Sequence, residues 1–198
     1  LPNNKQIFAP SSSKPHPELC GDYYDFCRLN AEEGVFCIAD VSGKGISAAL
    51  LMSNFQANLR ALIENNSNLE QIMPKLNERV MSSAKGEKFI TMFLAKYNYT
   101  TRTLEYITAA HNPPIMYKTE SKELKFLKAG CLGLGMLDEI PTIQKGREQI
   151  DERTKLLCYT DGLVEIMDET KVHYDTDQIK NRMTNEIGRA SCRERVCH

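Results

Sequence analysis

The chain has 198 residues, of which 41% are hydrophobic and 26% are charged. This length suits one domain with a short extension, since a domain commonly holds about 100–150 residues. Twenty-five basic against 26 acidic residues leave a formal net charge of −1, which argues against a nucleic-acid partner held through phosphate contacts. No apolar run approaches the roughly 20 residues of a membrane-spanning helix. We therefore expect a soluble chain with no membrane segment.

The cysteines and the N-terminal sequence indicate the compartment. Seven cysteines are scattered without the CxxC spacing of a zinc site, and several lie in apolar runs where a free thiol behaves as a small hydrophobe. The first residues lack the basic and then apolar pattern of a signal peptide. Both observations favour reduced thiols and a cytoplasmic protein.

The two ends of the chain differ in texture from its middle. Residues 1–18 contain four prolines and three consecutive serines, which is typical of a linker or irregular arm. Residues 186–198 hold two cysteines and three arginines without strand or helix periodicity, and they resemble the non-native tails that cloning vectors append. Residues 19–185 are expected to form the folded domain.

The first half of this domain shows one strand and two helices. Residues 35–39 are an apolar run typical of a buried strand, and a turn cluster rich in Ser and Gly follows. Apolar residues at helical spacing predict a helix over residues 46–64. A capping box beginning at Ser67 predicts a second helix over residues 67–83, with a kink or a delayed start at Pro74.

The second half is dominated by hairpins. Residues 89–97 and 103–110 predict one hairpin, and residues 115–118 and 124–127 predict another. A last buried strand is predicted over residues 155–159. Because hairpins outnumber strand–helix–strand repeats, we expect an α/β (α+β) fold, a largely antiparallel β-sandwich flanked by helices.

Three aspartates stand where predicted strands or apolar residues meet turns, namely Asp22, Asp40 and Asp161. Each alone is explained by ordinary turn chemistry. Three hard carboxylates held at a rim also suit Mg²⁺ or Mn²⁺. Both interpretations stay open from the residues alone.

Other motifs point to no alternative chemistry. The sequence lacks a Walker A loop, a dinucleotide-binding glycine fingerprint and the Gly-x-Ser-x-Gly elbow of a serine hydrolase. His111 ends a predicted strand before two prolines, and it is interpreted as a hydrogen-bonded structural histidine because no nucleophile accompanies it.

Six segments resemble a known family when taken in order. They are GDYYDF, FCIADVSGKGISAALLM, FITMFLAKYN, LEYITAAHNPPIMY, GLGM and LLCYTDGLVE, within residues 19–165. They are similar to SpoIIE/RsbU-type bacterial serine/threonine phosphatases of the metal-dependent type 2C superfamily. The resemblance implies a type 2C phosphatase-like sandwich and a hydrolase that uses two Mn²⁺ or Mg²⁺ ions to activate water.

The resemblance also implies roles for individual residues. Asp40 resembles the carboxylate that bridges both metals, and the Val41 backbone carbonyl would bind one of them. Asp22 resembles the acidic residue that serves that same ion, partly through water, whereas Asp161 resembles a ligand of the other ion. Eukaryotic type 2C relatives often carry a histidine just after the metal-binding Asp-Gly, and Ser42 occupies that place here, which implies that water protonates the leaving group.

The family's fourth metal-binding aspartate has no counterpart here. Asp175 and Asp177 follow Asp161 in the wrong sequence context. We expect a domain truncated at its C-terminus, with weak or no activity, whose metal at Asp161 binds less tightly than the metal at Asp22, Asp40 and Val41. A native absence would instead favour a non-catalytic phosphoprotein-binding or regulatory module on the same fold.

Partners follow from the resemblance alone. The family acts in bacterial signal transduction, on phosphorylated anti-sigma-factor antagonist proteins that control sigma factors. A sensor domain normally precedes the phosphatase domain and controls it through a linker. The two predicted helices offer a surface for regulation or for a homodimer, although core packing is sufficient to explain their apolar stripes.

Overall fold

The computed structural model describes residues 21–161. The expected arm at residues 1–18, the end of the domain after Asp161 and the tail at residues 186–198 lie outside the described residues, as do Asp175 and Asp177.

Two sheets and two helices make up the described part of the chain. The helices are α1 (Ile46–Asn65) and α2 (Leu69–Ala84). One sheet has six strands, namely β1 (Tyr23–Arg28), β2 (Glu33–Val41), β3 (Ile90–Asn98), β4 (Thr103–Ala109), β7 (Gly130–Cys131) and β8 (Gly146–Gln149). The first five lie in this order, and β8 also pairs with β4. The other has three, in the order β6 (Glu123–Phe126), β5 (Ile115–Lys118) and β9 (Thr154–Leu157).

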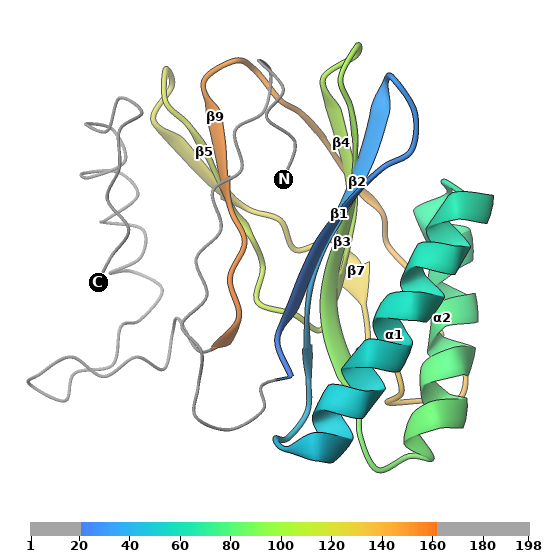
Figure 1. Ribbon diagram of the computed structural model, residues 1–198. Helices are drawn as coiled ribbons and strands as arrows, with labels where there is room; N and C mark the ends of the chain where they lie inside the picture. Colours follow the sequence, from blue (N-terminus) through green and yellow to red (C-terminus); the bar gives the residue numbers. More distant parts are fainter. Residues whose placement is uncertain (1–20, 162–198) are drawn as a thin grey trace, which may run out of the picture.

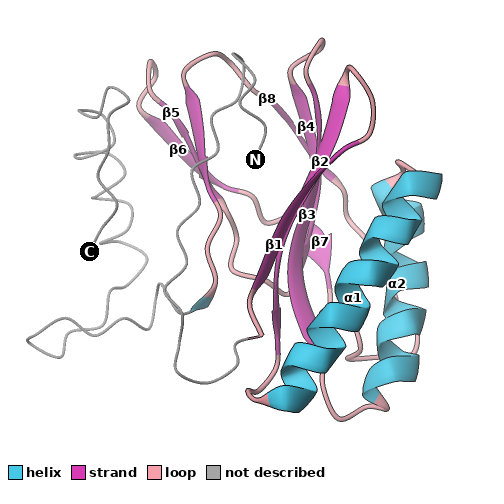
Figure 2. Cartoon of the chain, in the orientation of Figure 1, coloured by secondary structure: helices cyan, strands magenta, loops and turns pink. Residues whose placement is uncertain are grey.

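The layers confirm the fold class expected from the sequence. Both helices cover one face of the six-stranded sheet, and the three-stranded sheet lies on the opposite side (Figures 1 and 2). All strand pairs are antiparallel except β4 with β7. Within residues 21–161 the helices flank only one side of the sandwich. No helix in this part of the chain is both long and apolar enough to cross a membrane.

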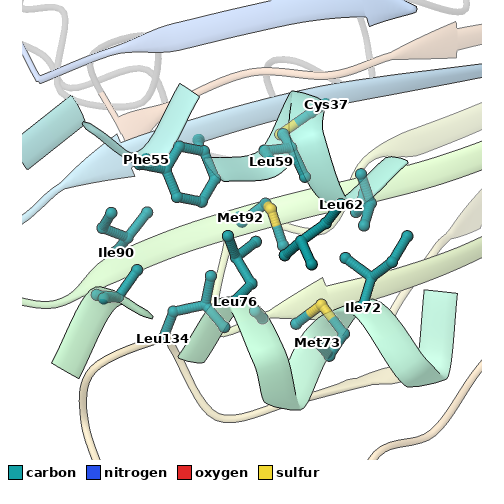
Figure 3. Packing of buried hydrophobic residues seen from close by; sticks show 14 of the residues in the cluster. Cys37, Phe55, Leu59, Leu62, Ile72, Met73, Leu76, Ile90, Met92 and Leu134 are labelled. Atoms are coloured by element: carbon teal, nitrogen blue, oxygen red, sulfur yellow. The ribbon is translucent and has the colours of Figure 1, made fainter. Parts of the chain in front are cut away.

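Strand β3 shows why the sheet has two different faces. Alternate side chains of a strand point to opposite faces. Met92 and Leu94 accordingly pack with the helices, in the core that Figure 3 shows around Phe55 and Leu76. Phe93 belongs instead to the core between the two sheets. Because β3 is buried on both faces, its sequence is almost continuously apolar.

Helix α2 differs slightly from the sequence prediction. It begins after Asn68, whose side chain accepts a hydrogen bond from the backbone N–H of Glu70, so Ser67 is not the capping residue. Pro74 lies within the helix, which continues through it from Leu69 to Ala84.

Three strands of the six-stranded sheet were not predicted. Strand β1 mixes tyrosines with charged residues and is only half-buried, so its sequence carries no clear apolar alternation. Strand β7 has only two residues, and the four residues of β8, GREQ, include no apolar side chain, so neither strand shows a recognisable apolar pattern.

Candidate active site

The register of β1 and β2 brings Asp22 beside Asp40. Tyr23 pairs with Ala39, so continuing the antiparallel register by one residue places Asp22 opposite Asp40. Along β2, Phe36 and Ile38 pack in the core between the sheets. Asp40 continues this row with period two, which places its carboxyl at the end of the sandwich interior.

The third aspartate comes from the other sheet. Strand β9 ends its pairing with β5 at Leu157, and Asp161 follows four residues later, at the end of the described residues. Asp161 and Asp22 are exposed, whereas Asp40 is half-buried. The structure thus places the three aspartates near enough for their charges to act on Asp40, two from one sheet and one from the other, but within residues 21–161 it does not bring them into one set of metal ligands.

Electrostatics confirm that the three carboxyl groups share one environment. The pKa of Asp40 is raised from 3.8 to about 7, chiefly by burial and then by the negative charges of Asp22 and Asp161. A hydrogen bond with the Asp22 side chain raises this pKa further, whereas the Val41 backbone N–H lowers it. The cluster is a like-charge arrangement that a bound cation would relieve.

Gly21 leaves open the space in which two of the candidate ligand oxygens meet. A Cβ at Gly21 would lie 3.0 Å from the Val41 carbonyl oxygen and 3.1 Å from an Asp40 carboxylate oxygen. Both oxygens therefore border the same small space, which stays open because residue 21 has no side chain. This agrees with the expected pairing of Val41 and Asp40 at one ion.

The turn after Asp40 is held by Ser42 together with two residues that the sequence did not single out, Phe89 and Lys88. Ser42 and Phe89 exchange two hydrogen bonds, the Ser42 N–H with the Phe89 carbonyl and the Phe89 N–H with the Ser42 hydroxyl, both 2.9 Å long. Lys88 Nζ donates to the Ser42 carbonyl at 3.2 Å. This lysine is half-buried beside the turn, whereas Lys44 is exposed. Only the three-dimensional structure reveals Lys88, because it lies 48 residues from Asp40 in sequence.

His111 lies behind the carboxylates. It is buried, with 6% of its surface exposed, and its Nδ1 lies 3.0 Å from the Thr91 hydroxyl. Thr91 is the cross-strand partner of Asp40 in β2 and β3. Burial lowers the pKa of His111, while the Tyr159 carbonyl and the charges of Asp161 and Asp22 oppose that shift. The sequence analysis interpreted His111 as a hydrogen-bonded structural histidine, and the contact of Nδ1 with Thr91 agrees with the hydrogen-bonded part of that interpretation.

The donor atoms at this site suit a hard divalent cation, although the candidate ligands do not form a complete coordination site within the described residues. Asp22, Asp40 and the Val41 carbonyl offer oxygen atoms, which Mg²⁺ and Mn²⁺ prefer. Across residues 21–161, no three side chains of His, Cys, Asp or Glu are arranged so that they could hold a metal ion together. The ligand roles of the aspartates and Val41 therefore remain predictions.

Known proteins are similar to this chain in sequence and in architecture. The chain matches the family described as Stage II sporulation protein E (SpoIIE) over residues 31–197. It is 30% identical over 169 residues to the phosphoserine phosphatase RsbU of Bacillus subtilis (strain 168), covering 85% of this chain and 50% of RsbU. This chain spans about half the length, or less, of the curated relatives that it matches.

Solved structures agree in fold. The SiaA-PP2C domain of Pseudomonas aeruginosa superposes with a TM-score of 0.72 at 17% identity, covering 85% of this chain and 67% of that one. RsbX, solved in complex with magnesium, gives a TM-score of 0.57 at 21% identity, covering 86% of this chain and 82% of RsbX. The fold is therefore that of a type 2C (PP2C-like) phosphatase domain. Within that class, the chain belongs to the SpoIIE family.

Proposed function

We propose that this domain is a metal-dependent protein phosphatase that removes phosphate from phosphoserine or phosphothreonine. The observation that carries the proposal is the half-buried carboxyl of Asp40 beside Asp22 and Asp161, at the end of a PP2C-like sandwich. Membership of the SpoIIE family and the likeness to RsbU, a phosphoserine phosphatase, support the same activity.

The proposed ligands fall into two groups. Asp22, Asp40 and the Val41 carbonyl would hold one Mn²⁺ or Mg²⁺ ion, and Asp40 with Asp161 would hold a second. Bound ions of this kind lower the pKa of a water molecule and neutralise charge on phosphoryl oxygens. The magnesium found with RsbX supports a divalent cation of this type without deciding between the two metals.

The chain's own residues would orient the reaction. Strand β2 fixes Asp40, and the paired hydrogen bonds between Ser42 and Phe89 hold the turn that follows. The Ser42 hydroxyl already accepts the Phe89 N–H, which suits an anchor better than an acid catalyst. We therefore keep the expectation that solvent protonates the leaving hydroxyl group.

The proposed substrate is a phosphorylated anti-sigma-factor antagonist protein in a bacterial signalling circuit. RsbU and RsbP are both named phosphoserine phosphatases. The match to the SpoIIE family supports a phosphatase role for this chain as well. In the whole protein a sensor domain N-terminal to this one would control the activity. A homodimer and a cytoplasmic location belong to the same proposal.

Phosphate release from a phosphoserine peptide, measured with and without Mn²⁺ and with the chain in excess over substrate, tests the activity. A single-turnover format suits a chain whose turnover we expect to be slow. We expect Mn²⁺-dependent release that Asp40→Asn reduces by at least about 100-fold, as for loss of a central electrostatic group. Asp138→Asn, which changes an exposed aspartate elsewhere, is the matched control.

Two results would contradict the proposal. Release that persists unchanged in Asp40→Asn would exclude the proposed carboxylate site. Binding of the phosphopeptide with no release at any Mn²⁺ concentration would instead support the non-catalytic phosphoprotein-binding module.

A further inference from the structure

One ring nitrogen of His111, Nε2, lacks the hydrogen-bond partner that a buried polar atom normally has. Nε2 is buried, and it is the only buried side-chain nitrogen or oxygen in the described part of the chain that has no hydrogen-bond partner. Buried polar groups are nearly always paired, so an exception in a native fold calls for an explanation. The Tyr159 backbone carbonyl faces this ring closely enough to raise its pKa, but without the geometry of a hydrogen bond.

The surroundings of the ring favour one tautomer. On one side, Nδ1 lies 3.0 Å from the hydroxyl of Thr91, which can donate its proton. The other groups that act on the ring are the Tyr159 carbonyl and the charges of Asp161 and Asp22, which can only accept. A neutral ring with the proton on Nε2 satisfies both sides, because Nδ1 accepts and Nε2 is ready to donate.

The segment before Asp161 is held by the packing of the buried Tyr159 side chain against Ile115 and Tyr117, but not by pairing with β5. The ladder between β9 and β5 ends at Leu157, so cross-strand pairing with β5 does not extend to the stretch from Tyr159 to Asp161. Thr91, by contrast, is held within the six-stranded sheet, where it pairs with Asp40 across strands β3 and β2. A contact from this rigid pair of strands to Tyr159 would relate the position of Asp161 to that of Asp40.

We propose that Thr91 and His111 are positioning residues that dock the Tyr159–Asp161 segment and so bring Asp161 to the Asp22–Asp40 pair. In the docked state, Nε2–H donates to the Tyr159 carbonyl. This contact gives the unpaired Nε2 a partner, since hydrogen bonds of a catalytic site often tighten only in the complex. The catalytic consequence of this docking rests on the proposed phosphatase function.

Two matched pairs of substitutions isolate the hydrogen bonds from the packing. His111→Gln keeps a donor near the position of Nε2, whereas His111→Phe keeps a flat ring without a donor. Thr91→Ser keeps the hydroxyl, whereas Thr91→Val keeps the shape and removes it. Loss of a hydrogen-bond partner that orients a metal ligand typically weakens affinity by about 10- to 100-fold.

The first measurement is Mn²⁺ affinity of the 198-residue chain by titration calorimetry, with thermal unfolding as a check of folding. We expect His111→Phe and Thr91→Val to bind the ion that needs Asp161 about 10- to 100-fold more weakly. His111→Gln and Thr91→Ser should stay within about threefold of the unchanged chain. Equal losses in His111→Gln and His111→Phe would show that the ring matters by its shape alone, and the proposal would fail. Absence of any Mn²⁺ binding by the unchanged chain would overturn it too.

The second measurement is independent of metal and activity. The NMR chemical shifts of the imidazole nitrogens report which ring nitrogen carries the proton. We expect His111 to be protonated at Nε2 and unprotonated at Nδ1 in the unchanged chain. In Thr91→Val we expect a mixture of the two tautomers. A proton on Nδ1 in the unchanged chain would overturn the proposal. Phosphate release by the unchanged chain separates the two hypotheses: its absence counts against the phosphatase function, whereas wild-type release in His111→Phe counts against the positioning role.

Discussion

Asp40 illustrates how a functional residue can oppose stability. Its carboxyl is half-buried and faces two other carboxylates, so without a cation the folded state bears a repulsion that the unfolded chain escapes. Nothing in the core requires a charge at this position, because the neighbouring residues of the row, Phe36 and Ile38, are apolar. The residue is best explained by what it binds.

We predict that Asp40→Asn stabilises the metal-free chain at neutral pH by about 1 kcal/mol, since removing a repelled, partly desolvated charge is favourable while solvent screening limits the gain. Denaturant unfolding in the presence of a chelator measures the difference. Asp138→Asn, an exposed change with no such neighbours, should lie within about 0.5 kcal/mol of the unchanged chain. A clear loss of stability in Asp40→Asn would contradict the repulsion.

Gly21 should be required for the site rather than for the fold. An alanine Cβ here would press against the Val41 carbonyl and the Asp40 carboxylate, at 3.0 and 3.1 Å. We predict that Gly21→Ala unfolds within a few degrees of the unchanged chain but binds Mn²⁺ about tenfold more weakly, since displaced ligands lose affinity steeply. Calorimetric titration checks the affinity, and unchanged binding would show that Val41 and Asp40 do not act together at this space.

At the scale of elements, sequence patterns predicted the parts that alternate or repeat over many residues. Both hairpins and helix α1 were predicted within one or two residues of their observed limits. Strand β1 escaped because Asp25 and Arg28 interrupt its apolar residues. The importance of Thr91 could not be predicted either, because only the register of β2 with β3 makes it the partner of Asp40.

Asp25 explains why a charged residue occupies a half-buried strand. Arg60 of α1 holds its carboxylate through two hydrogen bonds of 2.7 and 3.0 Å, and the Tyr23 hydroxyl donates a third at 2.6 Å. These bonds, the two from Arg60 above all, lower the pKa of Asp25 from 3.8 to about 2 despite partial burial. The cluster joins helix α1 to strand β1, next to the candidate ligand Asp22.

The hydrogen bonds of Arg60 and Tyr23 to the Asp25 carboxylate predict an acid-sensitive contribution to the free energy of unfolding. Because the folded pKa of Asp25 lies below its unfolded value, the contribution is complete above about pH 4 and is lost as the pH falls through about 2. Asp25→Asn should therefore lower stability at pH 7 and lose less than the unchanged chain on acidification. Denaturant unfolding at several pH values measures both.

Tyr23→Phe offers a finer test of the same cluster. It removes one hydrogen bond to Asp25 and keeps the edge-on contact of the ring with Phe55, so we expect a loss of about 0.5–1.5 kcal/mol at pH 7. In the Asp25→Asn background the loss should be smaller, because the charged acceptor is gone. Equal losses in both backgrounds would show that the hydroxyl acts elsewhere.

For the whole molecule, the candidate site depends on how two sheets meet. Asp22 and Asp40 are fixed by the six-stranded sheet, whereas Asp161 follows the last strand of the three-stranded sheet. Sequence patterns placed each aspartate near the end of an element but contained no information on the packing of one sheet against the other. The resemblance to a family supplied that relation, and in the structure the charges of Asp22 and Asp161 contribute to the raised pKa of Asp40.

A metal ion bound across this junction should stabilise the whole domain, because it binds the folded state alone. At a concentration 100 times the dissociation constant, one site adds about 2.7 kcal/mol. We predict that Mn²⁺ raises the unfolding temperature by several degrees, that Asp161→Asn keeps part of this rise, and that Asp40→Asn abolishes it. The asymmetry follows from the ligands, since Asp22, Asp40 and Val41 can hold one ion without Asp161.

Thermal unfolding over a series of Mn²⁺ concentrations measures each shift, with Asp138→Asn expected to respond like the unchanged chain. Two equally tight ions in calorimetry, or a complete loss of the shift in Asp161→Asn, would contradict a site in which one ion depends on the six-stranded sheet alone.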